Sequence, residues 1–258
     1  MACITLLSDF GLQEASVAIA KGVLMQHNPD LTIVDISHEV KQFYTAQAAY
    51  LLSAAWHHFP SGTCHILLFD LFSEKTVSVL VAEMDGQYFI SADSGLLPAA
   101  LPTPPETWIF KELSPAETYI DWLHAASKVI NQLQGSDMEV MNLQPFKPRN
   151  AKQNRPLETG DTIKCDVIHI DRYENVVLNI TREQFESIGK GRPFRLEYVQ
   201  VEEITELSNT YADVKPGQKL CRFNSNGYLE ICVNRGNAAS LFGLKLGGMK
   251  NEIKITFG

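Results

Sequence analysis

The sequence lacks the short motifs that mark many common enzyme chemistries. Among its 258 residues there is no HExxH, no GxSxG and no glycine-rich phosphate loop of the GxGxxG or GxxxxGK[ST] type. These absences argue against a zinc protease, a serine esterase of the α/β-hydrolase type and a ligand held by its phosphates. We therefore expect neither a metal nor a cofactor.

Cysteine is sparse and scattered. The five cysteines form no CxxC pair, and Cys3, Cys64 and Cys165 adjoin or lie within apolar, strand-like runs. Small buried thiols usually pack as hydrophobic side chains, whereas structural metal sites need closely spaced ligands. We expect reduced thiols instead of disulfides.

Positive charge and long apolar runs are also scarce. The chain carries 22 Lys and Arg against 30 Asp and Glu, a net charge of −8 that does not favour the nucleic-acid backbone as a partner. No apolar run reaches the length of a membrane span, and the N-terminus lacks the pattern of a signal peptide. We expect a cytoplasmic protein with no nucleic-acid or membrane partner.

The first half of the chain, residues 1–140, alternates predicted strands and helices. Such an order is typical of an α/β domain with a mainly parallel sheet that is covered on both faces. The apolar runs predict strands over 4–7, 31–36, 65–69, 77–83 and 88–91 and helices over 14–27 and 45–59.

The pattern changes after residue 140. Residues 141–159 are rich in proline and polar side chains and predict a linker. Residues 160–258 show alternating strand patterns between glycine-rich turns, which is typical of antiparallel structure. We expect a C-terminal antiparallel β-barrel, with a β-sandwich as the alternative. It would contain a single short helix, over 237–242, and strands over 163–170, 176–180, 194–201, 219–223, 229–233 and 252–257.

Two aspartates follow buried strands of the first half. Asp9, in the string SDFG, ends the first predicted strand, and Asp70 ends the third. Open parallel sheets bind ligands beyond the carboxyl ends of their strands, so these carboxylates are candidate site residues. The alternatives are helix capping for Asp9 and a turn carboxylate for Asp70.

Two polar strings stand out in the second half. The hairpin IHIDRYENVVLNI carries Asp171, Tyr173, Asn175 and Asn179, a combination that suits recognition of a base or an amino acid. The string NRGNAAS, residues 234–240, either opens a helix whose free amides bind a ligand or forms a capped turn.

Seven strings, in order, resemble one family along nearly the whole chain, the S-adenosylmethionine (SAM) hydroxide adenosyltransferases or SAM hydrolases. The fluorinating and chlorinating adenosyltransferases are its relatives. The strings are ITLLSDFG, KGVL, IVDISHEV, FPSGTCHILLFD, SADSGLL, IHIDRYENVVLNI and NSNGYLEICVNRGNAASLFGL. The resemblance implies an α/β domain, a β-barrel domain and a homotrimer that binds SAM between subunits.

The resemblance also implies roles for residues of the first half. Asp9 would hold the ribose hydroxyls, and Asp70 matches the catalytic aspartate of the members that use hydroxide. Ser73 lies where halogenating members have a small hydroxyl residue, and Phe43 lies where they carry a Trp over the ligand. Because Asp70 would repel a halide, the resemblance favours the hydroxide-using branch.

In the second half, Asp171 would meet the methionine ammonium and Asn175 the adenine edge. Tyr173 stands where the family usually has Phe, near the adenine. Asn237 and Ala238 would reach the adenine through a backbone turn. These five residues complete the implied substrate site.

The chain departs from the family in the loop after Asp70. The family has approximately D-P-G-V-G followed by an Arg, whereas this chain has DLFSEKTV, with Val77 at the Arg position. Lys75 is the nearest cation of that loop, and lysine lacks the planar fork of arginine.

A second departure concerns the family histidine. The family's F-H-G-R-D string corresponds to YIDWLHAASK, which has Asp121 at the histidine position, or His124 if the register shifts by three. Ser94 stands in place of a family Asn, and Glu174 in place of a Gly. The expected catalytic set is therefore Asp70, Lys75 and His124.

Three functions follow. The first is hydrolysis of SAM to adenosine and methionine by attack of water or hydroxide on the ribose C5′. The second is a SAM- or adenosine-binding protein without turnover, and the third is an enzyme of the same scaffold that uses another nucleophile or nucleoside. Lys75 or His124 directed at Asp70 would favour the first, whereas an Asp70 without a basic partner, or a cavity closed by Phe72, would favour the second.

Overall fold

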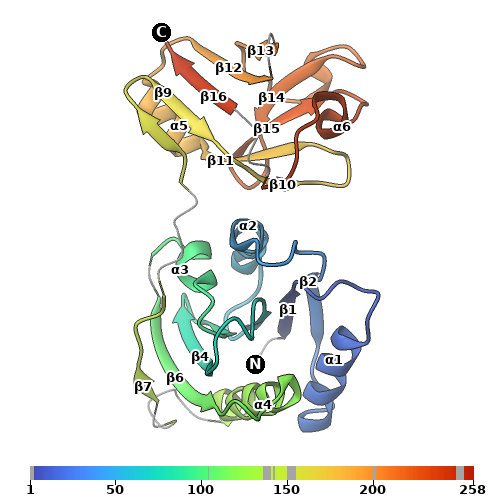
Figure 1. Ribbon diagram of the computed structural model, residues 1–258, viewed down its shortest axis with the longest axis vertical. Coiled ribbons are helices and arrows are strands. Elements are labelled where there is room, and N and C mark those ends of the chain that lie inside the picture. Colours follow the sequence, from blue (N-terminus) through green and yellow to red (C-terminus); the bar gives the residue numbers. More distant parts are fainter. Residues whose placement is uncertain are drawn as a thin grey trace. The chain divides into compact units, whose positions relative to one another are not determined.

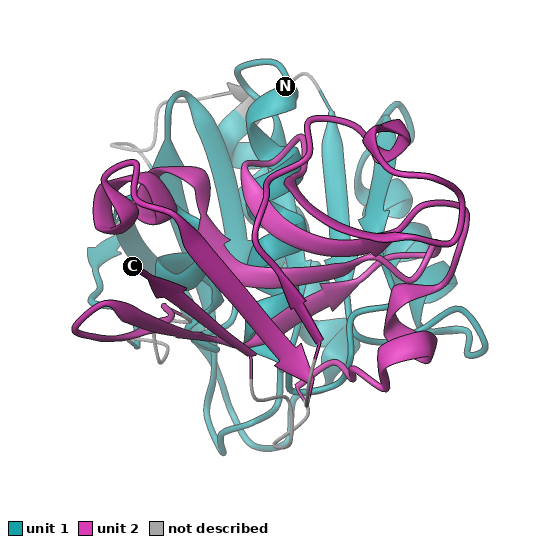
Figure 2. Cartoon of the chain, turned by 90° about the horizontal axis from the view of Figure 1, so that it is seen from above, with its two compact units in different colours: residues 1–153 teal, residues 154–258 magenta. Residues whose placement is uncertain are grey.

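The computed structural model describes residues 3–103, 105–135, 141, 143–149, 155–199, 202–247 and 253–258. The chain divides into two compact units, residues 1–153 and residues 154–258, which Figure 2 shows in different colours.

The first unit contains a seven-stranded mixed sheet in the order β2-β1-β3-β5-β4-β6-β7. Strands β2, β1, β3 and β5 run parallel, while β4, β6 and β7 are joined in antiparallel pairs. The strands are β1 (Ile4–Ser8), β2 (Ile33–Ser37), β3 (Cys64–Leu68), β4 (Val77–Met84), β5 (Gln87–Ser91), β6 (Glu106–Leu113) and β7 (Gln144–Pro145).

Helices cover both faces of this sheet, as expected (Figure 1). Alternate side chains of the strands face opposite layers: Leu6 belongs to the core beneath α1 and α4, and its neighbour Leu7 to the core beneath α2 and α3. The helices are α1 (Ser16–His27), α2 (Thr45–Ala55) with the 3-10 turn η1 (Trp56–His58), α3 (Leu96–Ala100) and α4 (Tyr119–Gly135).

The antiparallel part of the sheet has a local cause. Strands β4 and β5 are connected by Asp85 and Gly86 alone, with φ of +51° and +70°. An Asp-Gly pair with two positive φ angles forms a tight hairpin turn, whereas a parallel pair needs a crossover of a dozen residues. The sheet is therefore mixed, where the sequence predicts a mainly parallel one.

The second unit contains two antiparallel sheets with one core between them. Their strand orders are β10-β11-β15-β14 and β13-β12-β16-β9-β8. Within the described part of the chain, the strand pairings form these two sheets and do not close into one barrel. The strands are β8 (Leu157–Thr159), β9 (Thr162–Cys165), β10 (Val167–Ile170), β11 (Val176–Thr181), β12 (Phe194–Val199), β13 (Glu202–Ile204), β14 (Lys219–Phe223), β15 (Tyr228–Val233) and β16 (Ile253–Phe257).

Residues 163–170, predicted as one strand, form two. Strand β9 pairs with β16 and β8 in one sheet, and β10 pairs with β11 in the other. The chain crosses between the sheets at Asp166, whose amide donates to the Asn179 side chain at 2.8 Å. The sequence pattern does not reveal this crossing because apolar residues continue on both sides of it.

Helix α6 (Ala238–Phe242) is close to its predicted position, but the expectation of a single helix in this half is wrong. Helix α5 (Arg182–Gly189) follows β11, and the turn η3 (Tyr211–Asp213) precedes β14. Helix α5 begins with a capping box: Thr181 Oγ1 accepts from the Gln184 amide at 3.3 Å, and Gln184 Oε1 accepts from the Thr181 amide at 3.0 Å.

Replacing Thr181 by alanine should lower the free energy of unfolding by about 1 kcal/mol, because one of the free amides at the start of α5 loses its acceptor. Urea denaturation monitored by circular dichroism measures this change. Ser187→Ala, which removes an exposed hydroxyl from the same helix, is the matched control. An equal effect of the two substitutions would contradict the capping role.

Candidate functional site

Asp9 and Asp70 come together in one cavity of the first unit. Strands β1 and β3 are parallel neighbours with Ser8 opposite Leu68, so the residues that follow both strands emerge at the same edge of the sheet. The cavity has a volume of about 430 Å³, within the range typical of small-molecule sites. It is lined by Asp9, Phe10, Ser16, Phe43, Asp70, Leu71, Phe72, Ser73 and Tyr119.

Asp9 is half-buried among backbone amides. Burial raises the pKa of its carboxyl, and the negative charge of Asp70 raises it further. Backbone hydrogen bonds from Asp9 itself, Asp70 and Phe43 act in the opposite direction, but the net shift is upward. The Asp9 side chain therefore links the loops after β1, β2 and β3. Its negative charge favours binding of a ligand that carries a cation or several hydroxyl groups.

Asp70 has a backbone conformation that non-glycine residues seldom adopt, with φ of +48°. Its carbonyl accepts a hydrogen bond from the Ser73 hydroxyl at 3.3 Å, which closes the turn after β3. Burial raises the pKa of the Asp70 carboxyl, against the lowering effects of the Ser73 hydroxyl and the Arg149 charge. A carboxylate with a raised pKa is a better general base than an exposed one.

Aromatic side chains form the walls of the cavity. The rings of Phe10 and Tyr119 pack edge to face with centroids 5.3 Å apart, and the Tyr119 hydroxyl donates to the Ser16 carbonyl at 2.8 Å. Phe43, with φ of +60°, is 79% exposed, and Phe72 is 48% exposed. Exposed rings beside two carboxylates suit a ligand with a flat apolar part and a cationic part.

A chain of polar contacts that begins at the buried Ser8 and His38 supports the loop that carries Asp9. Ser8 Oγ lies 2.7 Å from His38 Nδ1, and His38 Nε2 lies 3.1 Å from Asp35. Asp35 also pairs with Lys21 at 2.6 Å, and the Gly11 amide donates to the His38 carbonyl at 2.7 Å. Although burial opposes it, the hydrogen bonds from Lys21 and His38 lower the pKa of Asp35. The loops after β1 and β2 are thus fixed to each other.

The other predicted catalytic residues lie apart from this cavity. His124 lines a second cavity, of about 330 Å³, and its Nδ1 lies 2.9 Å from His27 Nε2. Asp121 accepts hydrogen bonds from the Thr118 amide and hydroxyl at 2.7 and 2.8 Å and so caps α4. Lys75 is exposed in the loop after Asp70. Of the expected catalytic set, Asp70 alone lines the first cavity.

The sequence interpretation missed one cation beside Asp70. Arg149 lies in the stretch predicted as linker, which also contains strands β7 and β8. Its guanidinium pairs with Glu74 at 2.9 Å, and its charge lowers the Asp70 pKa. The residues before it show no periodicity that could have pointed to the sheet, so the sequence held no signal for this contact.

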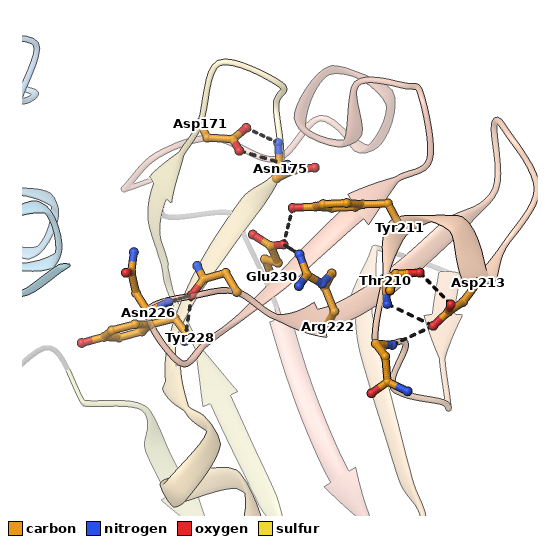
Figure 3. Close-up of polar contacts among 11 residues, drawn as sticks. Asp171, Asn175, Thr210, Tyr211, Asp213, Arg222, Asn226, Tyr228 and Glu230 are labelled. Atoms are coloured by element: carbon orange, nitrogen blue, oxygen red, sulfur yellow. Dashed lines mark hydrogen bonds and ion pairs between the residues drawn. The ribbon is translucent and has the colours of Figure 1, made fainter. Parts of the chain in front are cut away.

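The predicted site residues of the second unit also come together. Asp171 Oδ1 accepts from the Tyr173 amide at 2.8 Å. It also accepts from the Asn175 amide at 2.9 Å, and Oδ2 accepts from the Asn175 side chain at 2.9 Å (Figure 3). A carboxylate has about four acceptor positions, so one remains for a ligand. Tyr173 is 77% exposed beside this loop, while Asn175 is buried.

Glu174 joins this loop to the turn that carries Asn237 and Ala238. Its carboxylate accepts from Asn237 Nδ2 at 3.2 Å and from the Ser240 amide at 2.8 Å, and its carbonyl accepts from the Ala239 amide at 3.0 Å. These hydrogen bonds hold a glutamate with φ of +61° in place. They bring the two polar strings of the second half side by side.

A buried charged group lies beneath Asp171. Glu230 accepts from the Tyr211 hydroxyl at 2.8 Å and lies 3.4 Å from Arg222, whose guanidinium stacks 4.6 Å from the Tyr211 ring (Figure 3). Burial raises the pKa of Glu230, and the charge of Asp171 adds to this rise. Because Arg222 offsets the charge of the buried Glu230, Asp171 is the carboxylate of this pair that can attract a cationic group of a ligand.

The chemistry available is binding of a polar, cationic small molecule, with Asp70 as a candidate base. Among the residues that the structure describes, no three or more metal-ligating side chains cluster. No helix of the described chain is long and apolar enough to cross a membrane.

Comparison with known proteins identifies the family. The models of the SAM hydroxide adenosyltransferase N-terminal and C-terminal domains match residues 4–136 and 165–249. The chain belongs to the SAM hydroxide adenosyltransferase family.

Relatives with named activities include hydrolases and halogenating enzymes. The chain is 27% identical to the (R)-S-adenosyl-L-methionine hydrolase of Methanocaldococcus jannaschii over 98% of this chain and 95% of the relative. It is 24% identical to the fluorinase of Actinopolyspora mzabensis over 95% of this chain and 94% of the relative. A crystal structure of an uncharacterized conserved protein from Thermotoga maritima superposes with a TM-score of 0.82 at 25% identity, over 98% of this chain and 99% of that one.

Proposed function

We propose that this protein hydrolyses SAM to adenosine and L-methionine. The observation that carries the proposal is the cavity in which Asp9 and Asp70 lie together within a chain of this family. Both carboxylates have pKa values raised by burial, and a sulfonium cation would relieve the cost of keeping two negative charges close together.

The reaction is a substitution at the ribose C5′. A water oxygen forms the new C5′–O bond while the C5′–S bond breaks, and the bonding pair leaves on sulfur to give the neutral thioether of methionine. The water proton passes to Asp70. Because the substrate brings its own leaving group, the protein needs only to align the water, exclude solvent and take the proton, and the reaction needs no cofactor.

Four further residues that line the first cavity then have separate roles. Asp9 accepts hydrogen bonds from the ribose diol, and Ser73 holds the Asp70 turn closed. Phe43 and Phe72 offer exposed rings to the apolar surface of the nucleoside.

The second unit binds the two ends of the substrate. Asp171 pairs with the methionine ammonium, Asn175 and the turn of Asn237 and Ala238 bind the adenine edge, and Tyr173 packs on the base. We further propose a homotrimer in which each SAM molecule contacts two subunits, in the cytoplasm. The large exposed fractions of Phe43 and Tyr173 support such an assembly, because association would cover both rings.

The test is incubation of the full-length protein with SAM in halide-free buffer containing ¹⁸O-labelled water. Equimolar adenosine and methionine, with the label in the adenosine 5′-hydroxyl, is the expected result. Saturable binding of SAM without products would favour the binding-protein alternative. A 5′-halogenated nucleoside formed only after addition of a halide would favour the third function. Sedimentation velocity tests the trimer on the same sample.

A further inference from the structure

Arg149 reaches the Asp70 loop from a distant part of the chain. Strand β7 pairs with β6 at the edge of the sheet, and the Phe146 amide donates to the Thr107 carbonyl at 2.8 Å. The chain that follows β7 is therefore tied to the sheet shortly before Arg149.

Three contacts tie Arg149 to the loops after β3 and β5. Its amide donates to Asp93 Oδ1 at 2.8 Å, its Nε lies 3.6 Å from Asp93 Oδ2, and its guanidinium donates to Glu74 Oε1 at 2.9 Å. Asp93 lies in the turn after β5, and Glu74 lies four residues after Asp70. One arginine thus connects both loops through its backbone and its planar fork.

The charge of Arg149 also acts on Asp70. Besides burial, three groups act on the pKa of that carboxyl: the Ser73 hydroxyl and the positive charge of Arg149 lower it, and the negative charge of Glu74 raises it. Among the described residues, Arg149 is the one cation that lowers the Asp70 pKa. The charge of Arg149 therefore favours the ionised form of Asp70, whereas the burial of Asp70 disfavours that form.

We propose that Arg149 is a positioning residue of the Asp70 site, which fixes the strained turn at Asp70 by bridging Glu74 and Asp93. Arg149 thus provides the positive charge near Asp70. Within the loop of residues 70–77, the only cationic residue is the exposed Lys75. The catalytic consequence of this assignment rests on the proposed hydrolysis of SAM, whereas the electrostatic and structural consequences do not.

The test compares Arg149→Gln and Arg149→Lys with Lys147→Gln, which removes an exposed positive charge two residues away. Steady-state hydrolysis of SAM should show kcat reduced about 10- to 30-fold in Arg149→Gln with KM changed less than threefold, because the base is misplaced but the ligand groups remain. Arg149→Lys should recover part of the loss, since it retains the charge and loses the fork. Lys147→Gln should behave as the wild type.

A second measurement does not depend on turnover. Carbon-detected NMR of ¹³C-labelled aspartate follows the titration of Asp70 in the ligand-free protein. The pKa should rise in Arg149→Gln, rise less in Arg149→Lys and stay unchanged in Lys147→Gln.

These two measurements separate the proposals. If the wild type does not hydrolyse SAM but Arg149→Gln shifts the Asp70 titration, the proposed hydrolase activity is wrong and the role of Arg149 is supported. Indistinguishable kinetics and indistinguishable Asp70 titrations in Arg149→Gln and Lys147→Gln would overturn the role of Arg149.

Discussion

Replacing Asp70 by asparagine should lower kcat for SAM hydrolysis about 10²- to 10⁴-fold, the usual contribution of a general base. Asparagine keeps the size of the side chain and an acceptor oxygen, so the turn closed by Ser73 should persist. It cannot take the water proton, however. The Kd for SAM should change only a few-fold, because the ribose, adenine and ammonium contacts are assigned to other residues.

Rapid-quench or steady-state assays with chromatographic detection of adenosine measure this loss, and calorimetry measures the Kd. Asp30→Asn, the same chemical change at an exposed position, is the matched control. Full activity of Asp70→Asn would remove Asp70 from the chemistry.

The pH profile adds an independent check. Because burial raises the Asp70 pKa, its carboxylate is protonated at higher pH than an exposed aspartate. The kcat/KM of the wild type, which reports ionisations of the ligand-free protein, should therefore fall with decreasing pH in a range above the usual aspartate pKa of about 3.8. The residual activity of Asp70→Asn should lack this acid limb.

Local sequence patterns predicted the elements of the fold better than their connections. The strands β1 to β5 and the helices α1 and α2 follow apolar runs, and the structure confirms them within a few residues. The sheet is mixed because one Asp-Gly turn decides the direction of β4, and a strand pattern alone does not encode direction. Helix α5 was missed although its capping box, T-R-E-Q, stands in the sequence, because a helix of eight residues has little room for periodicity.

The candidate site, too, was predictable in part from the sequence. The proximity of Asp9 and Asp70 follows from two strands that end at one edge, which is a rule of topology and readable from sequence. The positions of His124 and Arg149 depend on the face that α4 presents and on the path of a polar segment after β7. Local sequence pattern fixes neither of these positions. For this reason the sequence did not reveal that Arg149, in a stretch predicted as a linker, lies near Asp70.

Replacing Asp171 should weaken binding through two separable effects. Asp171→Ala removes both the proposed partner of the methionine ammonium and the acceptor that orders Tyr173 and Asn175. We expect a loss of about 2–3 kcal/mol in SAM binding, or about 30- to 150-fold in Kd, as for the truncation of one member of a charged pair.

Adenosine separates the two effects because it has no ammonium. In Asp171→Asn, the side-chain oxygen can still accept the two amide hydrogen bonds of the loop, while the negative charge and the acceptor for the Asn175 side chain are lost. This variant should weaken SAM more than adenosine, whereas Asp171→Ala should weaken both further. Calorimetric titration of each ligand into the full-length variants measures the difference. Equal losses for SAM and adenosine in Asp171→Asn would mean that Asp171 orders the loop and does not contact the amino-acid end of the substrate.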